Sequence, residues 1–255
     1  MSCRFYRHTA LISALLTALL SVILFAACGD EYSERASFEE LMKNGMAYPV
    51  DVERILFTNF SELDGWYNEH GWKYSVVSGR VKTVRYYHEW TGYHVEYAAV
   101  CEIKVDGVSE RFNSANIKTG DTVRVLFGYG PTFCKDGRFD EAREMEFLSK
   151  KLGFEVESEL DLKGLDPFAF ELIPKKDGEY MMCTGWEMNT VPMEEGKKYA
   201  LFISEPEESK LYGTVCRAVL TYPLDETPDE LTEKYGLRYD PYYLKIGAEM
   251  ARIFK

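Results

Sequence analysis

Histidine and carboxylate side chains provide the first residues in this 255-residue sequence that could do chemistry. His88 and His94 flank Glu89, and Glu96 follows them; zinc sites and hydrolytic acid–base pairs use these residue types. Five residues separate the two histidines, and this spacing matches no metal-ligand signature. They are therefore weak candidates as ligands, and we expect no metal or other cofactor. A hydrolase that uses His88 or His94 with a nearby carboxylate remains an alternative.

Cys216 is the one cysteine whose surroundings suggest a nucleophile. The segment 214–217 (TVCR) resembles the T-x-T-C strand of sortases, which implies thiolate chemistry. That chemistry needs a histidine partner and an arginine that stabilises the oxyanion. The nearest upstream histidine is His94, and the next arginine after the motif is Arg238. We therefore predict no catalytic residue, and an enzyme is the less favoured interpretation.

Aromatic residues are the clearest candidates for binding. The chain contains 18 Tyr, 15 Phe and 4 Trp, and Tyr86, Tyr87, Trp90 and Tyr93 surround Gly92 in an expected hairpin loop. Rings displayed at the rim of a barrel can stack on sugars or anchor a protein partner. The alternative is that these rings belong to the core, because tyrosine suits half-buried positions.

Four cysteines of the body could form disulfides if the chain is exported. They allow three pairings, and the sequence does not choose among these pairings or exclude free buried thiols. No C-x-x-C motif occurs, so the sequence supports neither a zinc ribbon nor a thioredoxin-type pair. The four cysteines are Cys101, Cys134, Cys183 and Cys216.

The N-terminus has the pattern of an export signal. Arg4 and Arg7 precede an uncharged apolar run over residues 9–27. The following segment, 24–28 (LFAAC), resembles the lipobox of bacterial lipoproteins of the Gram-positive type. That resemblance implies that residues 1–27 are removed and that Cys28 carries a diacylglycerol. It places the protein at the outer face of the cell membrane; an uncleaved anchor or a freely secreted product are the alternatives.

The charge balance narrows the possible partners. The chain carries a formal charge of −12, and residues 1–27 hold two positive charges and no acid, so the remainder carries −14. This excess of acids argues against nucleic acid as a partner, because nucleic-acid recognition depends on Lys and Arg. The expected partners are the membrane, through the lipid anchor, and a surface protein or cell-wall glycan.

The exported part divides into a tether and one domain. Residues 28–50 are polar and punctuated by Gly45 and Pro49, which is typical of a spacer. Residues 51–255 are expected to form a single β-rich domain with helical additions. Within them, apolar spacing predicts a helix over 51–60 that an Asp64-Gly65 turn closes.

Alternating and apolar runs predict strands through most of this domain. Asp106-Gly107 favours a hairpin turn, because both positions of such a turn need positive φ. Helical patterns occur over 139–153, ended by Gly153, and after Thr227, where a capping box precedes two C-terminal helices. The strand-like runs are 73–87, 94–105, 122–127, 168–173, 179–186, 198–204 and 211–222.

The segment 193–204 (MEEGKKYALFIS) resembles the G-x-x-Y-x-L-F-x-S strand of a poorly characterised module of exported Gram-positive proteins. The resemblance extends over about residues 74–222 and implies a small OB-like β-barrel. The predicted fold is therefore α+β and mainly antiparallel, an OB-like barrel or sandwich with an inserted helix and C-terminal helices. The predicted function is a cell-surface binding or accessory lipoprotein; a hydrolase or a structural protein without a small-molecule site are the alternatives.

Overall fold

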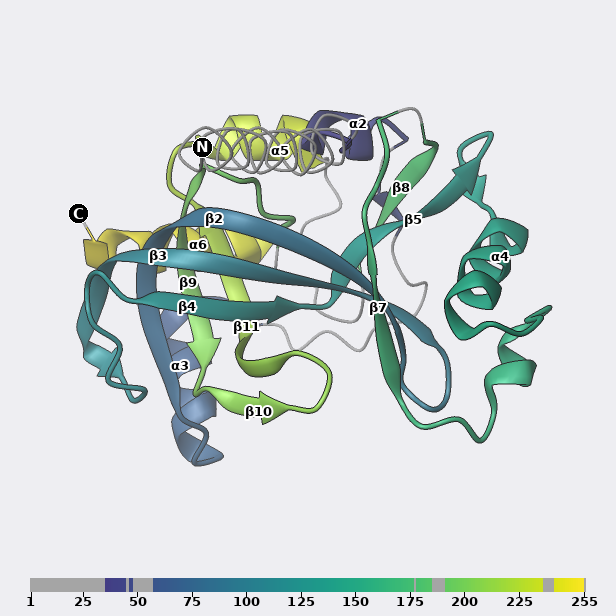
Figure 1. Cartoon of the computed structure of the whole chain (residues 1–255). Coiled ribbons are helices and arrows are strands. Elements are labelled where there is room, and N and C mark those ends of the chain that lie inside the picture. Colours follow the sequence, from purple (N-terminus) through teal and green to yellow (C-terminus); the bar gives the residue numbers. More distant parts are fainter. Residues whose placement is uncertain are drawn as a thin grey trace, which may run out of the picture.

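The computed structural model describes residues 35–44, 46–47, 57–176, 178–184, 191–235 and 241–254. At its centre five strands close into a ring in the order β2–β3–β4–β11–β9, because β9 pairs with both β11 and β2 (Figure 1). Neighbouring strands are antiparallel except β4 and β11, which are parallel. The ring consists of β2 (Tyr74–Trp90), β3 (Val95–Asn113), β4 (Thr122–Phe127), β9 (Lys198–Ser204) and β11 (Gly213–Pro223).

This strand order is that of the OB-fold, a five-stranded Greek-key barrel. The prediction of a mainly antiparallel α+β fold with an OB-like barrel, an inserted helix and C-terminal helices is confirmed. Apolar side chains that point inward from the strands fill the ring; Val76, Ile103 and Phe202 are fully buried. The alternation of side chains along each strand thus supplies both the core and the outer surface.

Helices from the N-terminal and C-terminal parts of the chain pack against the barrel. Tyr243, Ile246 and Met250 form an apolar stripe of α6 and are buried in the main core. The predicted capping box also forms, since the Thr227 hydroxyl accepts from the Glu230 amide at 3.3 Å. The helices are α2 (Phe38–Met42), α3 (Phe60–Glu69), α5 (Pro228–Tyr235), α6 (Pro241–Ala251) and η2 (Arg252–Phe254). The short strand β1 (Met46–Ala47) pairs instead with residues 182–183.

Between β4 and β9 the chain builds a second region, residues 129–184, which we call the inserted lobe. The lobe packs against the distal half of the long β2–β3 hairpin, beyond the barrel (Figure 1). Its helix buries Met145 and Leu148 against Trp90 at the end of β2. The lobe contains β5 (Tyr129–Lys135), β6 (Arg138–Phe139), α4 (Glu141–Leu152), η1 (Glu159–Leu162), β7 (Phe168–Leu172) and β8 (Tyr180–Thr184).

The predicted hairpin turn at Asp106-Gly107 is wrong. β3 continues through both residues, and the pairing with β2 shifts there from Ser78↔Gly107 to Gly79↔Val105, which leaves Asp106 as an extra residue in a bulge. A Cβ on Gly107 would lie 2.8 Å from the Ser78 hydroxyl oxygen. Glycine is therefore required here by close strand packing, and not by a turn.

Two further local predictions need correction. Asp64 and Gly65 lie inside α3, which begins after the N-cap Asn59, so they form no turn. Of the helix expected over 51–60, residues 51–56 lie outside the described part, and residues 57–59 precede α3 and are not helical. β5 was not predicted, because Gly130 and Pro131 suggested the end of a strand; the strand tolerates this proline and pairs it with Met182. One last local prediction is confirmed: α4 ends at Gly153 in the left-handed conformation.

Candidate functional site

The four aromatic residues predicted as a contact surface do not lie on one face. Trp90 is fully buried and Tyr86 is buried, because both point to the inner side of β2. Tyr87 points to the other side and packs edge-to-face on Tyr212, with ring centroids 5.1 Å apart. Tyr93 alone is strongly exposed, at 85%. Two of the rings therefore belong to the core, in agreement with the alternative considered for them.

The two histidines do not converge. His94 Nε2 lies 2.5 Å from Glu96 Oε1 at the hairpin tip, where both side chains are partly exposed. His88 is fully buried under the inserted lobe, and its Nδ1 lies 2.5 Å from Glu144 Oε1. Within the described residues no group of three or more His, Cys, Asp or Glu is placed to hold a metal ion. The two histidines therefore belong to separate carboxylate pairs, His88 with Glu144 and His94 with Glu96.

The buried His88–Glu144 pair is fully hydrogen-bonded. His88 Nε2 donates to the Pro131 carbonyl at 2.9 Å, and the Thr132 hydroxyl donates to Glu144 Oε2 at 3.1 Å. A carbonyl only accepts, so Nε2 carries a proton, and one further proton lies between Nδ1 and Oε1. The pair is neutral overall wherever that proton resides. It joins the β2–β3 hairpin to α4 and β5, which is a structural role.

The cysteines are not activated nucleophiles. All four are free thiols, so none of the possible pairings forms. Burial raises the pKa of Cys101 and Cys183 to about 12 and that of Cys216 to about 11. At neutral pH these groups are thiols and not the thiolates that nucleophilic catalysis needs.

Part of the outer surface on which OB-folds commonly bind ligands is covered by the chain itself. That surface lies on the second and third barrel strands, here β3 and β4. Ala98 and Val100 of β3 are buried beneath Tyr212, which precedes β11. The Tyr212 hydroxyl also donates to Glu89 Oε2 at 2.7 Å. The segment that contains β10 (Glu207–Ser209) therefore occupies part of this surface.

A cleft of about 420 Å³ opens instead at the other end of the β2–β3 hairpin, between α3, the start of β2 and the end of β3. We call it the Asp64 cleft. Its central residue is Asp64, whose carboxylate is nearly buried. The lining consists of Asp64, Asn68, Trp72, Lys73, Tyr74, Glu110, Arg111, Phe112, Asn113 and Ser114.

Three neighbours hold the Asp64 carboxylate in place. Oδ1 accepts from the Tyr74 hydroxyl and from Asn68 Nδ2, the latter at 2.6 Å. Oδ2 lies 3.6 Å from the Arg111 guanidinium, which remains 78% exposed and stacks over the Phe112 ring. Burial, followed by the interaction with Asp64, raises the pKa of Tyr74, so its hydroxyl stays a donor at neutral pH. Because most of the Arg111 side chain is exposed, its guanidinium has hydrogen-bond donors available to the cleft.

A column of aromatic rings connects this cleft to the barrel core. Tyr74 stacks on Phe202 with centroids 4.3 Å apart, and Tyr67 packs edge-on against both rings. Trp72 continues the column outward: its ring meets Tyr67 at 5.4 Å and Trp66 at 4.8 Å. Trp72 is 51% exposed, so the barrel holds a large aromatic ring at the edge of the cleft.

Sequence reasoning missed this site for an identifiable reason. Asp64 precedes a glycine, and this dipeptide suggested a turn. The N-cap Asn59, whose side chain accepts from the Glu62 amide at 3.0 Å, was the signal for a helix at this position. The grouping of Trp66, Tyr67 and Trp72 was visible in the sequence, but the distant Arg111 could not be placed beside it without the fold.

Compared with protein-family models, with curated proteins and with solved structures, the chain matches none. Cys28, the predicted lipidation site, lies outside the described residues. None of the helices in the described segments has the length and apolar character needed to cross a bilayer.

Proposed function

We propose that this protein is a lipid-anchored, extracytoplasmic binding protein that holds a cell-wall glycan in the Asp64 cleft. The observation that supports this function is the exposed Trp72 ring beside the ordered polar groups of Asp64, Asn68 and Arg111. Sugars present an apolar ring face, which stacks on an aromatic side chain, and a rim of hydroxyls, which planar polar side chains recognise.

The charge of the cleft favours an approximately neutral ligand. The lining holds two carboxylates, Asp64 and Glu110, and two cations, Lys73 and Arg111. Arg111 pairs with Asp64, and Lys73 lies 3.7 Å from Glu205, which is outside the lining. A polyanion would meet the carboxylates and a polycation would meet the cations, whereas hydroxyl and amide groups can pair with either. The volume is near the lower end of the range for small-molecule sites, so a short saccharide unit fits better than a long chain segment.

The N-terminal sequence supports the location of this activity. A signal followed by Cys28 would hold the domain near the cell wall. Part of the expected tether belongs to the folded domain, since Phe38–Met42 form α2 and Leu41 is buried in the main core. The folded domain would then bind the wall while the lipid on Cys28 remains in the membrane. The acidic charge agrees with this proposal, because a neutral glycan imposes no requirement for a basic surface.

Cosedimentation of the full-length chain with purified insoluble cell-wall glycan tests the proposal. We expect binding by the wild type and a loss of at least about tenfold in affinity for Trp72→Ala, corresponding to ~1.4 kcal/mol. Tyr93→Ala is the matched control, because it removes another exposed ring at the far tip of the β2–β3 hairpin. The proposal fails if the wild type does not bind, or if the two variants bind equally well.

A further inference from the structure

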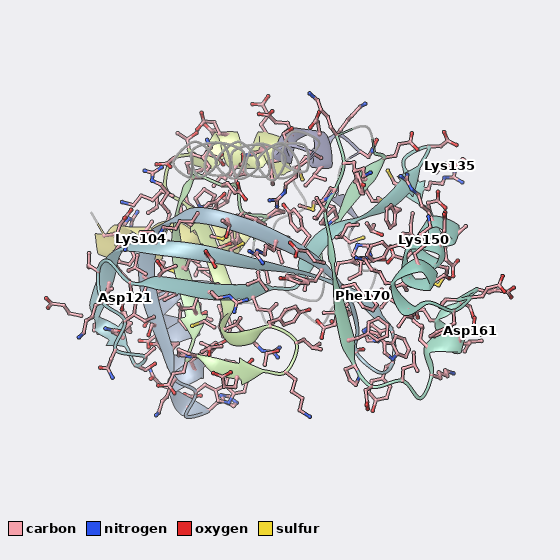
Figure 2. All side chains as sticks on the ribbon, viewed as in Figure 1. Lys104, Asp121, Lys135, Lys150, Asp161 and Phe170 are labelled. Atoms are coloured by element: carbon pink, nitrogen blue, oxygen red, sulfur yellow. The ribbon has the colours of Figure 1, made fainter. Side chains whose placement is uncertain are left out.

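A second concave surface lies on the inserted lobe, at the end of the molecule opposite the Asp64 cleft. Figure 1 shows α3 and α4 at opposite ends, and Figure 2 places Lys150 and Asp161 on the outer side of the lobe. The surface is a groove of about 760 Å³ between α4 and the segment that follows it. We call it the α4 groove.

The floor of the α4 groove is apolar and fixed. Met145 and Val156 form the floor and are buried in the same apolar cluster as Trp90. Phe154 lies beside them with 43% of its surface exposed. The Ser149 hydroxyl donates to the Met145 carbonyl at 2.8 Å and accepts from the Val156 amide at 2.8 Å. These bonds tie the two walls together, so the groove is formed before a partner binds.

Exposed apolar side chains are concentrated in this part of the molecule. In the described part of the chain nine large hydrophobic side chains are exposed, and six belong to the lobe or to the hairpin tip that it packs against. The barrel ring closes without the lobe, so barrel closure does not account for this apolar surface. Of the six, only Phe154 lines the α4 groove, where it extends the apolar floor. The six are Tyr93, Phe139, Phe154, Leu160, Leu165 and Ile173.

The rim of the α4 groove is acidic. Three carboxylates line it, on Glu146, Glu155 and Glu157, against one cation, Lys150. The Lys150 ammonium lies 2.5 Å from Glu146 Oε1, so this cation is already neutralised. The remaining charge around the apolar floor is therefore negative, which would repel an anionic lipid surface and attract a positively charged partner.

We propose that the α4 groove docks a basic amphipathic segment of a partner protein, with apolar residues on the floor and Lys or Arg against Glu155 and Glu157. A helix that presents one apolar face and flanking basic side chains satisfies both features at once. This interaction is independent of glycan binding, because none of the residues lining the α4 groove lines the Asp64 cleft.

Fluorescence anisotropy with the full-length chain and labelled peptides tests this proposal. The probe is a helical peptide of about four turns with Leu on one face and Lys on the other, compared with a scrambled peptide of the same composition. We expect the amphipathic peptide to bind at least about tenfold more tightly. We expect Phe154→Ser, and the double variant Glu155→Lys/Glu157→Lys, each to lower its affinity by about tenfold or more.

Two controls separate docking from general attraction. Asp229→Lys/Glu233→Lys on α5 changes the charge equally at another exposed place, and Ile253→Ser removes another exposed apolar side chain. Both should bind the peptide within about twofold of the wild type. Equal effects of control and groove variants would overturn the proposal. So would equal binding of the scrambled peptide, tighter binding to phosphatidylglycerol vesicles, or self-association lost in Phe154→Ser.

Discussion

At the scale of single residues, the His88–Glu144 pair shows how a chemically suggestive side chain can serve structure. His88 was a candidate for catalysis or metal binding, yet every polar atom of the pair has a partner within the protein. The His88 ring packs edge-on against Phe133 and Phe147, with centroids 5.8 and 5.1 Å apart. A hydrogen-bonded neutral pair can be buried there at modest cost, whereas a single charge could not.

This description predicts that Glu144→Gln is tolerated and Glu144→Leu is not. Glutamine can donate to Nδ1 of a neutral His88 while its oxygen still accepts from Thr132, so we expect a loss below about 1.5 kcal/mol. Leucine leaves two buried polar groups without partners, which costs about 2–6 kcal/mol. Urea unfolding of the two variants measures this difference; equal losses would show that the pair is not held as described.

The raised pKa values of the buried thiols predict a pH dependence of labelling. Because the pKa of Cys216 is about 11 and those of Cys101 and Cys183 are about 12, the folded chain keeps these groups protonated at pH 9. Iodoacetamide should modify them slowly in the native protein at this pH and rapidly after denaturation, with each site identified by mass mapping. Rapid native labelling of Cys216 at pH 8 would contradict the burial of this thiol.

At the scale of elements, two glycines that both lie inside helices have opposite roles in the fold. Gly65 lies in α3, and a methyl group there would meet nothing within 4 Å. Gly247 lies in α6, and a methyl group there would overlap the buried Tyr222 ring. The close approach of α6 to the barrel therefore depends on Gly247.

We predict changes of stability with opposite signs for these two positions. Gly65→Ala should stabilise the protein by about 0.5–1 kcal/mol, because alanine favours a helix interior. Gly247→Ala should destabilise it by about 1–3 kcal/mol, because α6 must move away from Tyr222. Thermal unfolding of both variants provides the test. A neutral Gly247→Ala would mean that α6 does not pack as closely as described.

Most elements were predictable because local pattern and tertiary fold agree in them. The acidic start, basic end and terminal glycine of α4 are read from the sequence, as are the capping box of α5 and most barrel strands. The exceptions are residues of types that are common in turns but have another role in this fold. Gly107 suggested a turn but accommodates a bulge, and Asp64 suggested a turn but forms the centre of a cleft.

The sites were less predictable than the elements. Trp90 is buried because the inserted lobe packs against the hairpin that was expected to display it, and Tyr86 is buried in the main core. Likewise, Asp64 and Arg111 are 47 positions apart, and only the antiparallel pairing of β2 with β3 brings them to one end of the barrel. Long-range pairing of this kind has no local signal in a single sequence.

At the scale of the whole molecule, the barrel separates two surfaces of different chemistry. The Asp64 cleft is polar with one exposed tryptophan, and the α4 groove is apolar with an acidic rim. In our proposal the N-terminal lipid holds this two-ended molecule at the membrane. The protein could then bind the wall at one end and a protein partner at the other.

Membrane attachment gives a prediction of its own. If Cys28 carries the lipid, Cys28→Ala should prevent lipid modification. The fraction of the protein retained by membranes washed in detergent-free buffer should then fall. Incorporation of a labelled fatty acid into the wild type but not into the variant measures this directly. Equal incorporation into both would refute lipidation at Cys28.

Glycan binding in the Asp64 cleft is the central claim, and the indole N–H signals of the tryptophans test it most directly. A titration of the ¹⁵N-labelled full-length chain with soluble saccharide fragments of the cell wall places Trp72 and Trp90 in one spectrum. Trp72 is exposed at the cleft, whereas Trp90 is buried under the inserted lobe and serves as the internal control. We predict a saturable shift of the Trp72 signal with the Trp90 signal unchanged. A Trp72 signal that does not move at saturating saccharide would contradict the account.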